Sequence, residues 1–419
     1  MPVQRRARTG GRKPYTANDV INARRMMQIV ALSAVASLQL QWTRSLLWAD
    51  STSAFDDEIN LGLFWQSHCQ MMSQVALVLY SAQPFFRPGV TYMVGPEHYS
   101  FERLERQFGQ TTTCKATFRF EAAHLRRLCR ALRFPDVMSD HNFSATGEEV
   151  FLYMIKRLSY PATLSTLAWD SGRNISAQSE MFKQGIEHVY HNFAHLRDNR
   201  SLECWAHHFP MFAAHVQRGG RKGRAPLNNC IGWVDGSNQF VSKPHLNQGI
   251  MFNGHKRKHC VKWQGVMLPN GIMPMPFGPI NGSNTDAFML ERSGLVRAMR
   301  RACKKVGAIY QLYGDPAYPQ SHWIGGPFRH SPLNYDEADF NSRMSSVRIV
   351  NEWGFGRIKI NWAFLDVENS HKVYLNDVQK YWPVAQILQN CHVCFYGNQV
   401  SEYFDCKAPE VEVYLSNNM

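Results

Sequence analysis

The chain has 419 residues, of which 44% are hydrophobic and 12% aromatic, which permits a large core and excludes a wholly disordered protein. The 46 Lys and Arg residues outnumber the 33 Asp and Glu residues, and the net charge of +13 favours a polyanionic partner, either nucleic acid or an acidic membrane surface. The longest apolar stretch, Ile29 to Leu40, is too short for a membrane span, and ten scattered cysteines without a secretory signal indicate a reducing compartment.

The amino-terminal part of the sequence predicts a tail followed by helices. Residues 1–19 are basic and are expected to be disordered. Such a tail suits a nuclear localisation signal or a nucleic-acid-contacting arm, with a mitochondrial transit peptide and a plain solvated tail as alternatives. Residues 20–117 form a helical region of unknown role, with helices expected over 20–48 and 56–80.

A second helical region, residues 118–195, carries a pattern typical of a helix-turn-helix. Thr146 and Glu149 fit a capping box that starts one helix. A short helix ending near Trp169 and a tight turn at Gly172 then precede a longer helix. We expect Gln178 and Lys183 on the outer face of that helix, as DNA contacts. The alternative is a plain helical bundle that packs on the next domain.

After residue 195 the pattern changes from helices to strands. Residues 196–228 are Gly- and Arg-rich and predict a flexible basic linker. Residues 229–400 then follow the order strand, hairpin, helix, strand, helix, with Asn270-Gly271 at the hairpin turn and a continuous helix over 286–306. This order predicts an α/β domain whose mixed sheet is covered by helices, followed by a tail at 401–419.

Three carboxylates stand where such a fold can bring separate segments together. Asp235 and Asp315 each end an apolar strand, and Glu352 lies within a predicted helix over 341–359. Cleavage of a phosphodiester by two metal ions requires carboxylates from separate segments, and Mg²⁺ prefers hard oxygen ligands. Spacing alone does not distinguish these three acids from ordinary turn and helix residues.

The segments around these acids give the set its specificity. Residues 230–396 resemble the DDE endonuclease domain of PIF/Harbinger transposases, in six motifs that occur in the family's order. The motifs are Val234-Asp235-Gly236-Ser237, Lys256-Arg257-Lys258, Gly282-Ser283-Asn284-Thr285-Asp286, Gly314-Asp315-Pro316-Ala317-Tyr318-Pro319, Glu352-Trp353-Gly354-Phe355-Gly356-Arg357-Ile358-Lys359 and Leu388-Gln389-Asn390-Cys391-His392. The chain has Thr285 where the family often has His, and Gln389-Asn390 where His-Asn is commoner.

The resemblance implies an RNase H-like fold and a nuclear enzyme that cuts and joins DNA. It implies two divalent ions, Mg²⁺ or Mn²⁺, with Asp235 bridging them and Asp315 and Glu352 each completing one side. Asp286 becomes a candidate fourth metal-binding acid. The implied partners are transposon ends and target DNA, a separate Myb-like DNA-binding protein and further copies of the chain in a homo-oligomer; no membrane partner is expected.

Basic side chains in the same half of the chain predict contacts with DNA phosphates. Those on the helix after residue 286 are Arg297 and Arg301, and those before the second strand are Lys256, Arg257 and Lys258. A solvated basic face is the alternative. A lone Cys391-His392-Val393-Cys394 cluster lacks the second ligand pair of a closed zinc site.

Two other functions fit the same sequence. One is a domesticated transposase that acts as a nuclear DNA-binding or scaffold protein without cleavage. The other is an RNase H-like nuclease that acts on a different nucleic-acid substrate.

Overall fold

The protein is represented by a computed structural model, which describes residues 98–108, 112–140, 143–219 and 225–416. The predicted tail at 1–19 and the helices predicted over 20–48 and 56–80 lie outside the described residues. By their contacts, residues 93–419 form one unit. No helix in the described part of the chain is long and apolar enough to cross a membrane.

The described chain starts with a helical region that contains one small β-hairpin. Its elements are α3 (Phe101–Phe108), α4 (Thr112–Phe118), α5 (Ala122–Ala131), β1 (Val137–Asp140), β2 (Phe143–Thr146), α6 (Gly147–Ser159), α7 (Leu164–Ser171) and α8 (Ile175–Asn192). Thr146 is the N-cap of α6 and accepts a hydrogen bond from the Glu149 amide, as predicted. The Glu149 carboxylate instead binds the Arg173 guanidinium, at 2.6 and 2.7 Å, which ties α6 to the start of α8.

Helices α7 and α8 meet at a tight turn, as the helix-turn-helix pattern requires. Gly172 ends α7 in the left-handed conformation, at φ 65°, which a glycine adopts without strain. The prediction that Gln178 lies on the outer face of α8 is wrong. Its side chain is fully buried, accepts a hydrogen bond from Tyr153 Oη and donates one to the Arg173 carbonyl. Lys183 is exposed and pairs with Glu180 at 3.8 Å.

The segment predicted as a flexible linker is largely helical. It contains α9 (Arg200–Glu203), α10 (Phe209–Arg218) and 3₁₀ turns at Ala194–Leu196 and Ala206–His208, while residues 220–224 lie outside the described part. Phe209, Phe212, Ala213 and Val216 of α10 are buried, and the helix contacts the central strand β3. The spacing of Phe209, Phe212 and Val216 is that of a buried helical face. The Gly- and Arg-rich run that suggested a linker begins only at the end of this helix.

A mixed sheet follows, with strand order β4-β5-β3-β7-β8 and with β6 paired to β5. The strands are β3 (Cys230–Phe240), β4 (Phe252–Asn253), β5 (Lys258–Met267), β6 (Phe277–Asn281), β7 (Gln311–Gly314) and β8 (Ile324–Gly325). Strands β3 and β5 are antiparallel, whereas β3, β7 and β8 run parallel. This mixed α/β layout is compatible with the expected RNase H-like domain.

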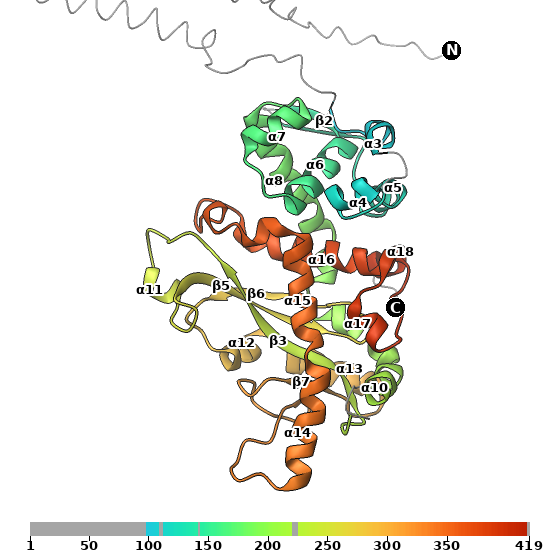
Figure 1. Cartoon of the computed structure of the whole chain (residues 1–419), viewed down its shortest axis with the longest axis vertical. Helices are drawn as coiled ribbons and strands as arrows, with labels where there is room; N and C mark the ends of the chain where they lie inside the picture. Colours follow the sequence, from blue (N-terminus) through green and yellow to red (C-terminus); the bar gives the residue numbers. More distant parts are fainter. Residues whose placement is uncertain (1–97, 109–111, 141–142, 220–224, 417–419) are drawn as a thin grey trace, which may run out of the picture. The chain divides into compact units, whose positions relative to one another are not determined.

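Helices cover the sheet and complete the domain (Figure 1). They are α11 (Gln248–Met251), α12 (Asp286–Ser293), α13 (Leu295–Val306), α14 (Tyr335–Arg348), α15 (Val350–Asn361), α16 (Val378–Tyr396), α17 (Gln399–Tyr403) and α18 (Val411–Ser416). Two helices predicted as continuous are divided. Gly294, at φ 70°, separates α12 from α13, and Ile349 separates α14 from α15.

The predicted hairpin after β5 has the expected turn but not the expected second strand. Gly271 lies at φ 81° and its amide donates to the Leu268 carbonyl, as a tight turn requires. Residues 272–276 do not pair as a strand, because the backbone of Met273 is bound by side chains of α16. Pairing with β5 resumes at β6.

Asn390 of α16 holds this buried segment in place. Its Oδ1 accepts from the Met273 amide at 2.9 Å, and its Nδ2 donates to the Met273 carbonyl at 2.8 Å and to Tyr414 Oη at 2.9 Å. The Asn390 side chain is 1% exposed. Buried backbone groups without partners are costly, so this amide joins the sheet, α16 and α18.

We expect Asn390→Ala to lower the free energy of unfolding by about 2–3 kcal/mol, because it leaves the Met273 amide without an acceptor in a dry interior. Urea denaturation measures this loss. Gln379→Ala, at an exposed position of the same helix, is the matched control and should change stability by less than about 0.5 kcal/mol. Equal effects of the two substitutions would contradict this account.

Candidate active site

Asp235 lies in the middle of β3, opposite Gly265 of β5. Its Oδ1 accepts a hydrogen bond from the Gly236 amide at 2.8 Å, and its Oδ2 lies 3.7 Å from the Arg348 guanidinium. Burial raises the pKa of Asp235 to about 6, and the nearby charges of Asp315 and Asp286 act in the same direction. The Gly236 hydrogen bond and Arg348 lower this pKa, so they only partly offset the cost of a buried negative charge.

Asp315 comes beside Asp235 through strand pairing. Strands β3 and β7 are parallel, with Val234 opposite Gly314, so each aspartate is the next residue after this pair. Because the two strands run in the same direction, the residues that follow this pair lie on the same side of it, and so do the two carboxylates. Asp315 Oδ1 accepts from the Ala317 amide at 2.8 Å, which fixes the turn after β7. The two aspartates thus lie on neighbouring strands, and their role as metal ligands stays a prediction.

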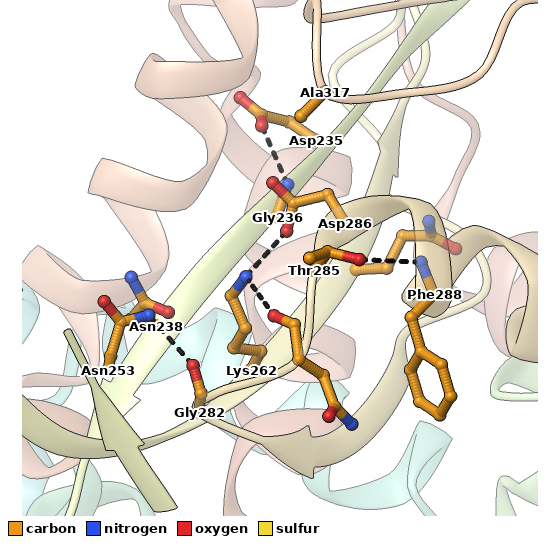
Figure 2. A network of polar contacts seen from close by, with 12 residues as sticks. Asp235, Gly236, Asn238, Asn253, Lys262, Gly282, Thr285, Asp286, Phe288 and Ala317 are labelled. Carbon is orange, nitrogen blue, oxygen red and sulfur yellow. Dashed lines mark hydrogen bonds and ion pairs between the residues drawn. The ribbon is translucent and has the colours of Figure 1, made fainter. Parts of the chain in front are cut away.

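Asp286 opens α12 and lies against Gly236 on the other face of β3. A side chain in place of Gly236 would lie 3.1 Å from Asp286 Oδ1, and successive strand residues point to opposite faces. Lys262 of β5 donates to Asp286 Oδ1 at 2.8 Å and to the Asn284 carbonyl at 2.9 Å. In Figure 2 the Asp286 carboxylate points toward Lys262, whereas the Asp235 carboxylate points away from it.

Thr285 acts as the N-cap of α12. Its side chain accepts a hydrogen bond from the Phe288 amide at 3.2 Å, which orients the helix whose first residue is Asp286 (Figure 2). A threonine therefore serves this structural purpose at the position where the resembling family often has histidine.

Tyr318 is a site residue that the sequence reasoning missed, although it lies in the Asp315 motif. Its ring is 1% exposed, and the charges of Asp235, Asp286 and Asp315 all contribute to raising its pKa well above the usual value, after burial. Gln264 Nε2 donates to Tyr318 Oη at 3.4 Å. The Tyr318 hydroxyl thus lies within electrostatic reach of all three aspartates.

Glu352 lies on α15, which packs closely on the sheet beside Asp235. A side chain at Gly354 would collide with Met267, and one at Gly265 would lie 2.8 Å from the Phe355 ring, so these two glycines allow helix and sheet to approach. Arg348, which reaches Asp235, precedes Glu352 by four residues. Glu352 itself is exposed.

The structure thus brings Asp235, Asp315 and Asp286 within electrostatic reach of one another and places Glu352 on the adjoining helix. Within the described ranges, no three His, Cys, Asp or Glu side chains already stand close enough together to hold a metal ion. Cys391, His392 and Cys394 lie in α16, where burial lowers the pKa of His392 to about 4.

Some of the basic residues predicted to bind DNA are paired with a carboxylate, and others are not. Arg297 is exposed on α13, and Lys256 and Arg257 are exposed between β4 and β5. Arg301 instead pairs with Glu203 of α9 at 2.5 Å, and Lys258 pairs with Glu368 at 2.9 Å. Three of the six basic residues predicted to contact DNA, namely Lys258, Arg301 and Lys183 of α8, are therefore paired with a carboxylate within the protein.

Comparison with known families gives one match. Residues 234–390 match the family of DDE superfamily endonucleases. The matched segment begins one residue before Asp235 and contains Asp286, Asp315 and Glu352. The match covers less than half of the chain, and it supports a DDE transposase-like nuclease that acts on DNA with divalent metal ions. No curated protein and no solved structure matches the chain.

The residues at this site fit a divalent cation. Their carboxylate oxygens are the hard ligands that Mg²⁺ and Mn²⁺ take. Burial is the largest cause of the raised pKa of Asp235, and repulsion from the charges of Asp315 and Asp286 adds to it, while Arg348 lowers it. A divalent cation near Asp235 and Asp315 would remove this repulsion.

The raised pKa of Asp235 predicts a pH-dependent stability difference between the native protein and Asp235→Asn. The pKa of Asp235 rises from about 4 in the unfolded chain to about 6 in the fold, so between these values the folded protein binds more protons. Stability from this group therefore falls as pH rises from about 4 to 6 and stays low above it. Without metal, we expect Asp235→Asn to gain about 2 kcal/mol relative to the native chain across this window.

Thermal unfolding in EDTA at pH 4.5 and pH 7.5 measures the difference. Asp336→Asn, at an exposed position of α14, is the control and should show no such pH dependence. A stability difference between native protein and Asp235→Asn that is the same at both pH values would refute the electrostatic account of this site.

Proposed function

We propose that this protein is a metal-dependent DNA endonuclease of the PIF/Harbinger transposase type, which cuts DNA and joins the ends to a target. One observation carries the proposal: the parallel pairing of β3 and β7 sets Asp235 beside Asp315 within the segment that matches DDE endonucleases. The raised pKa of Asp235 supports a site that gains from a cation.

In this proposal Asp235, Asp315 and Glu352 would together hold the divalent ions. When bound, such ions polarise the scissile phosphate and lower the pKa of the attacking water or 3′ hydroxyl. The Gly236 amide orients the Asp235 carboxylate, and the Ala317 amide orients that of Asp315. Preset carboxylates reduce the reorganisation that metal binding requires.

We assign Asp286 a positioning role rather than a direct metal contact. It binds Lys262 at 2.8 Å on the opposite face of β3 from Asp235, and both side chains are largely buried. Through this pair, the positive charge of Lys262 offsets the negative charge of Asp286. Arg348 is the second such cation, and it contacts Asp235 from the end of α14.

The proposal also includes the residues that contact DNA. Exposed Arg297, Lys256 and Arg257 supply phosphate contacts, and Lys183 on α8 extends them to the helix-turn-helix. A nuclear location, a Myb-like partner and assembly into a homo-oligomer complete the proposal, on the resemblance of residues 230–396 to PIF/Harbinger transposases.

The exposed position of Glu352 favours the main alternative, a domesticated transposase that binds DNA without cutting it. An RNase H-like nuclease for RNA or for DNA junctions is the other alternative. Both are decided by the same cleavage experiment with different substrates.

We expect Asp235→Asn and Glu352→Gln each to reduce cleavage of labelled duplex DNA in Mg²⁺ or Mn²⁺ by more than about 100-fold. Changes to residues that merely orient a metal ligand already cost roughly 10–100-fold, and loss of a ligand should cost more. Asp336→Asn is the control and should cleave normally. Cleavage that survives both substitutions, or that EDTA does not stop, would refute the assignment; cleavage of RNA alone would favour the second alternative.

We expect Arg297→Gln to reduce the slope of log binding constant against log salt by about 0.9 for duplex DNA, the loss of one phosphate contact. Arg301→Gln is the matched control on the same helix, because Glu203 already neutralises Arg301. Its slope should change less. An equal reduction for the two variants would contradict the assignment of a phosphate contact to Arg297.

A further inference from the structure

A surface at the β4 edge of the sheet has features that cleavage at Asp235 does not require. It consists of the segment 243–259, which includes α11 and the β4–β5 hairpin, together with the neighbouring loop 371–376 (Figure 1). We call it the hairpin surface. Asn247 Nδ2 donates to Tyr374 Oη at 3.1 Å, which joins the two segments.

The hairpin surface exposes apolar and aromatic side chains that no described element covers. Large exposed apolar side chains close together mark an interaction site. The exposed fractions are 59% for Leu246, 45% for Ile250, 39% for Phe252, 59% for Tyr374 and 78% for Leu375. Phe252 is held in place by β4 pairing and by an edge contact with His259, at 5.4 Å between ring centroids.

The same surface is basic. Segment 243–259 contains four Lys and Arg residues and no Asp or Glu. Lys258 is paired with Glu368, but Lys243, Lys256 and Arg257 are exposed and have no ion-pair partner among the described residues. The hairpin turn is fixed, because the Lys256 amide donates to Asn253 Oδ1 and Arg257 lies at φ 53°.

Aromatic rings interleaved with free cations match the requirements of unpaired nucleic acid. Bases present their faces for stacking only when they are unpaired, and cations bind the backbone between them. Duplex phosphates would use the cations but leave the apolar side chains in water. We propose that the hairpin surface binds single-stranded DNA, with bases on Phe252 and Tyr374 and phosphates at Lys256 and Arg257.

The position of the surface fits a strand that also reaches the candidate active site. Asp235 pairs with Gly265, and Lys258 at the hairpin lies seven residues earlier on the same strand. At roughly 3.3 Å per residue, the hairpin lies roughly 23 Å from Asp235 along β5. An unpaired strand next to a cut would therefore span both. This inference rests on the proposed function for its DNA substrate, but not on cleavage.

The test measures binding of the full chain in EDTA, by fluorescence anisotropy, to a labelled oligothymidine 20-mer and to a duplex of the same length. We expect Phe252→Ala with Tyr374→Ala to weaken oligothymidine binding about tenfold or more and duplex binding less than twofold. The matched control is Tyr335→Ala, which is 86% exposed on α14 and should leave both affinities unchanged.

A second variant tests the cations separately. Lys256→Gln with Arg257→Asn, chosen because asparagine tolerates a positive φ, should lower the salt slope for oligothymidine by about 1.4, the loss of two single-strand phosphate contacts. The aromatic variant should leave this slope unchanged, because stacking releases no counterions.

The inference is overturned if the aromatic variant binds oligothymidine as tightly as the native chain, or if it weakens duplex binding equally. Because the assay contains no metal, failure of the proposed nuclease function would appear as absent cleavage with these binding results intact. Normal cleavage with unchanged oligothymidine binding would overturn the hairpin inference alone.

Discussion

The parallel pairing of β3 with β7 is the constraint on which the rest of the candidate site depends. It requires a crossover between the two strands, which runs through α11, β4, β5 and β6 before α12 and α13. The crossover places Asp286 at the start of α12, against Gly236, while the pairing places Asp315 beside Asp235. Carboxylates from three distant segments thus come within electrostatic reach of one another, and the charges of Asp315 and Asp286 add to the effect of burial in raising the pKa of Asp235.

Two cations, Lys262 and Arg348, partly offset the negative charge of these aspartates. Lys262 binds Asp286, and Arg348 lies close to Asp235. Tyr318 lies within electrostatic reach of Asp235, Asp286 and Asp315. Each cation comes from a different element, β5 and α14, so the balance of charge also ties the sheet to its covering helices. A divalent cation bound beside Asp235 would reduce the remaining repulsion and so would stabilise the fold.

Close approach of α15 to the sheet is the second condition for the site. Gly265 and Gly354 remove the side chains that would otherwise hold helix and sheet apart. The buried amide of Asn390 secures the neighbouring segment around Met273, whose side chain packs at both glycines. Glu352 therefore lies on a helix whose distance from Asp235 is set by residues that carry no charge.

Local pattern and motif order in the sequence identified the candidate acids, because Asp315 follows an apolar strand, Asp235 follows the apolar part of β3, and Glu352 stands in an ordered set of motifs. They also determined the cap at Thr146 and the turn at Gly271, since both depend on a few adjacent residues. Only the tertiary structure decided that Gln178 is buried, that Arg301 and Lys258 are neutralised, and that Tyr318 lies among the aspartates. Burial and charge pairing arise from residues far apart in the chain, which no local pattern contains.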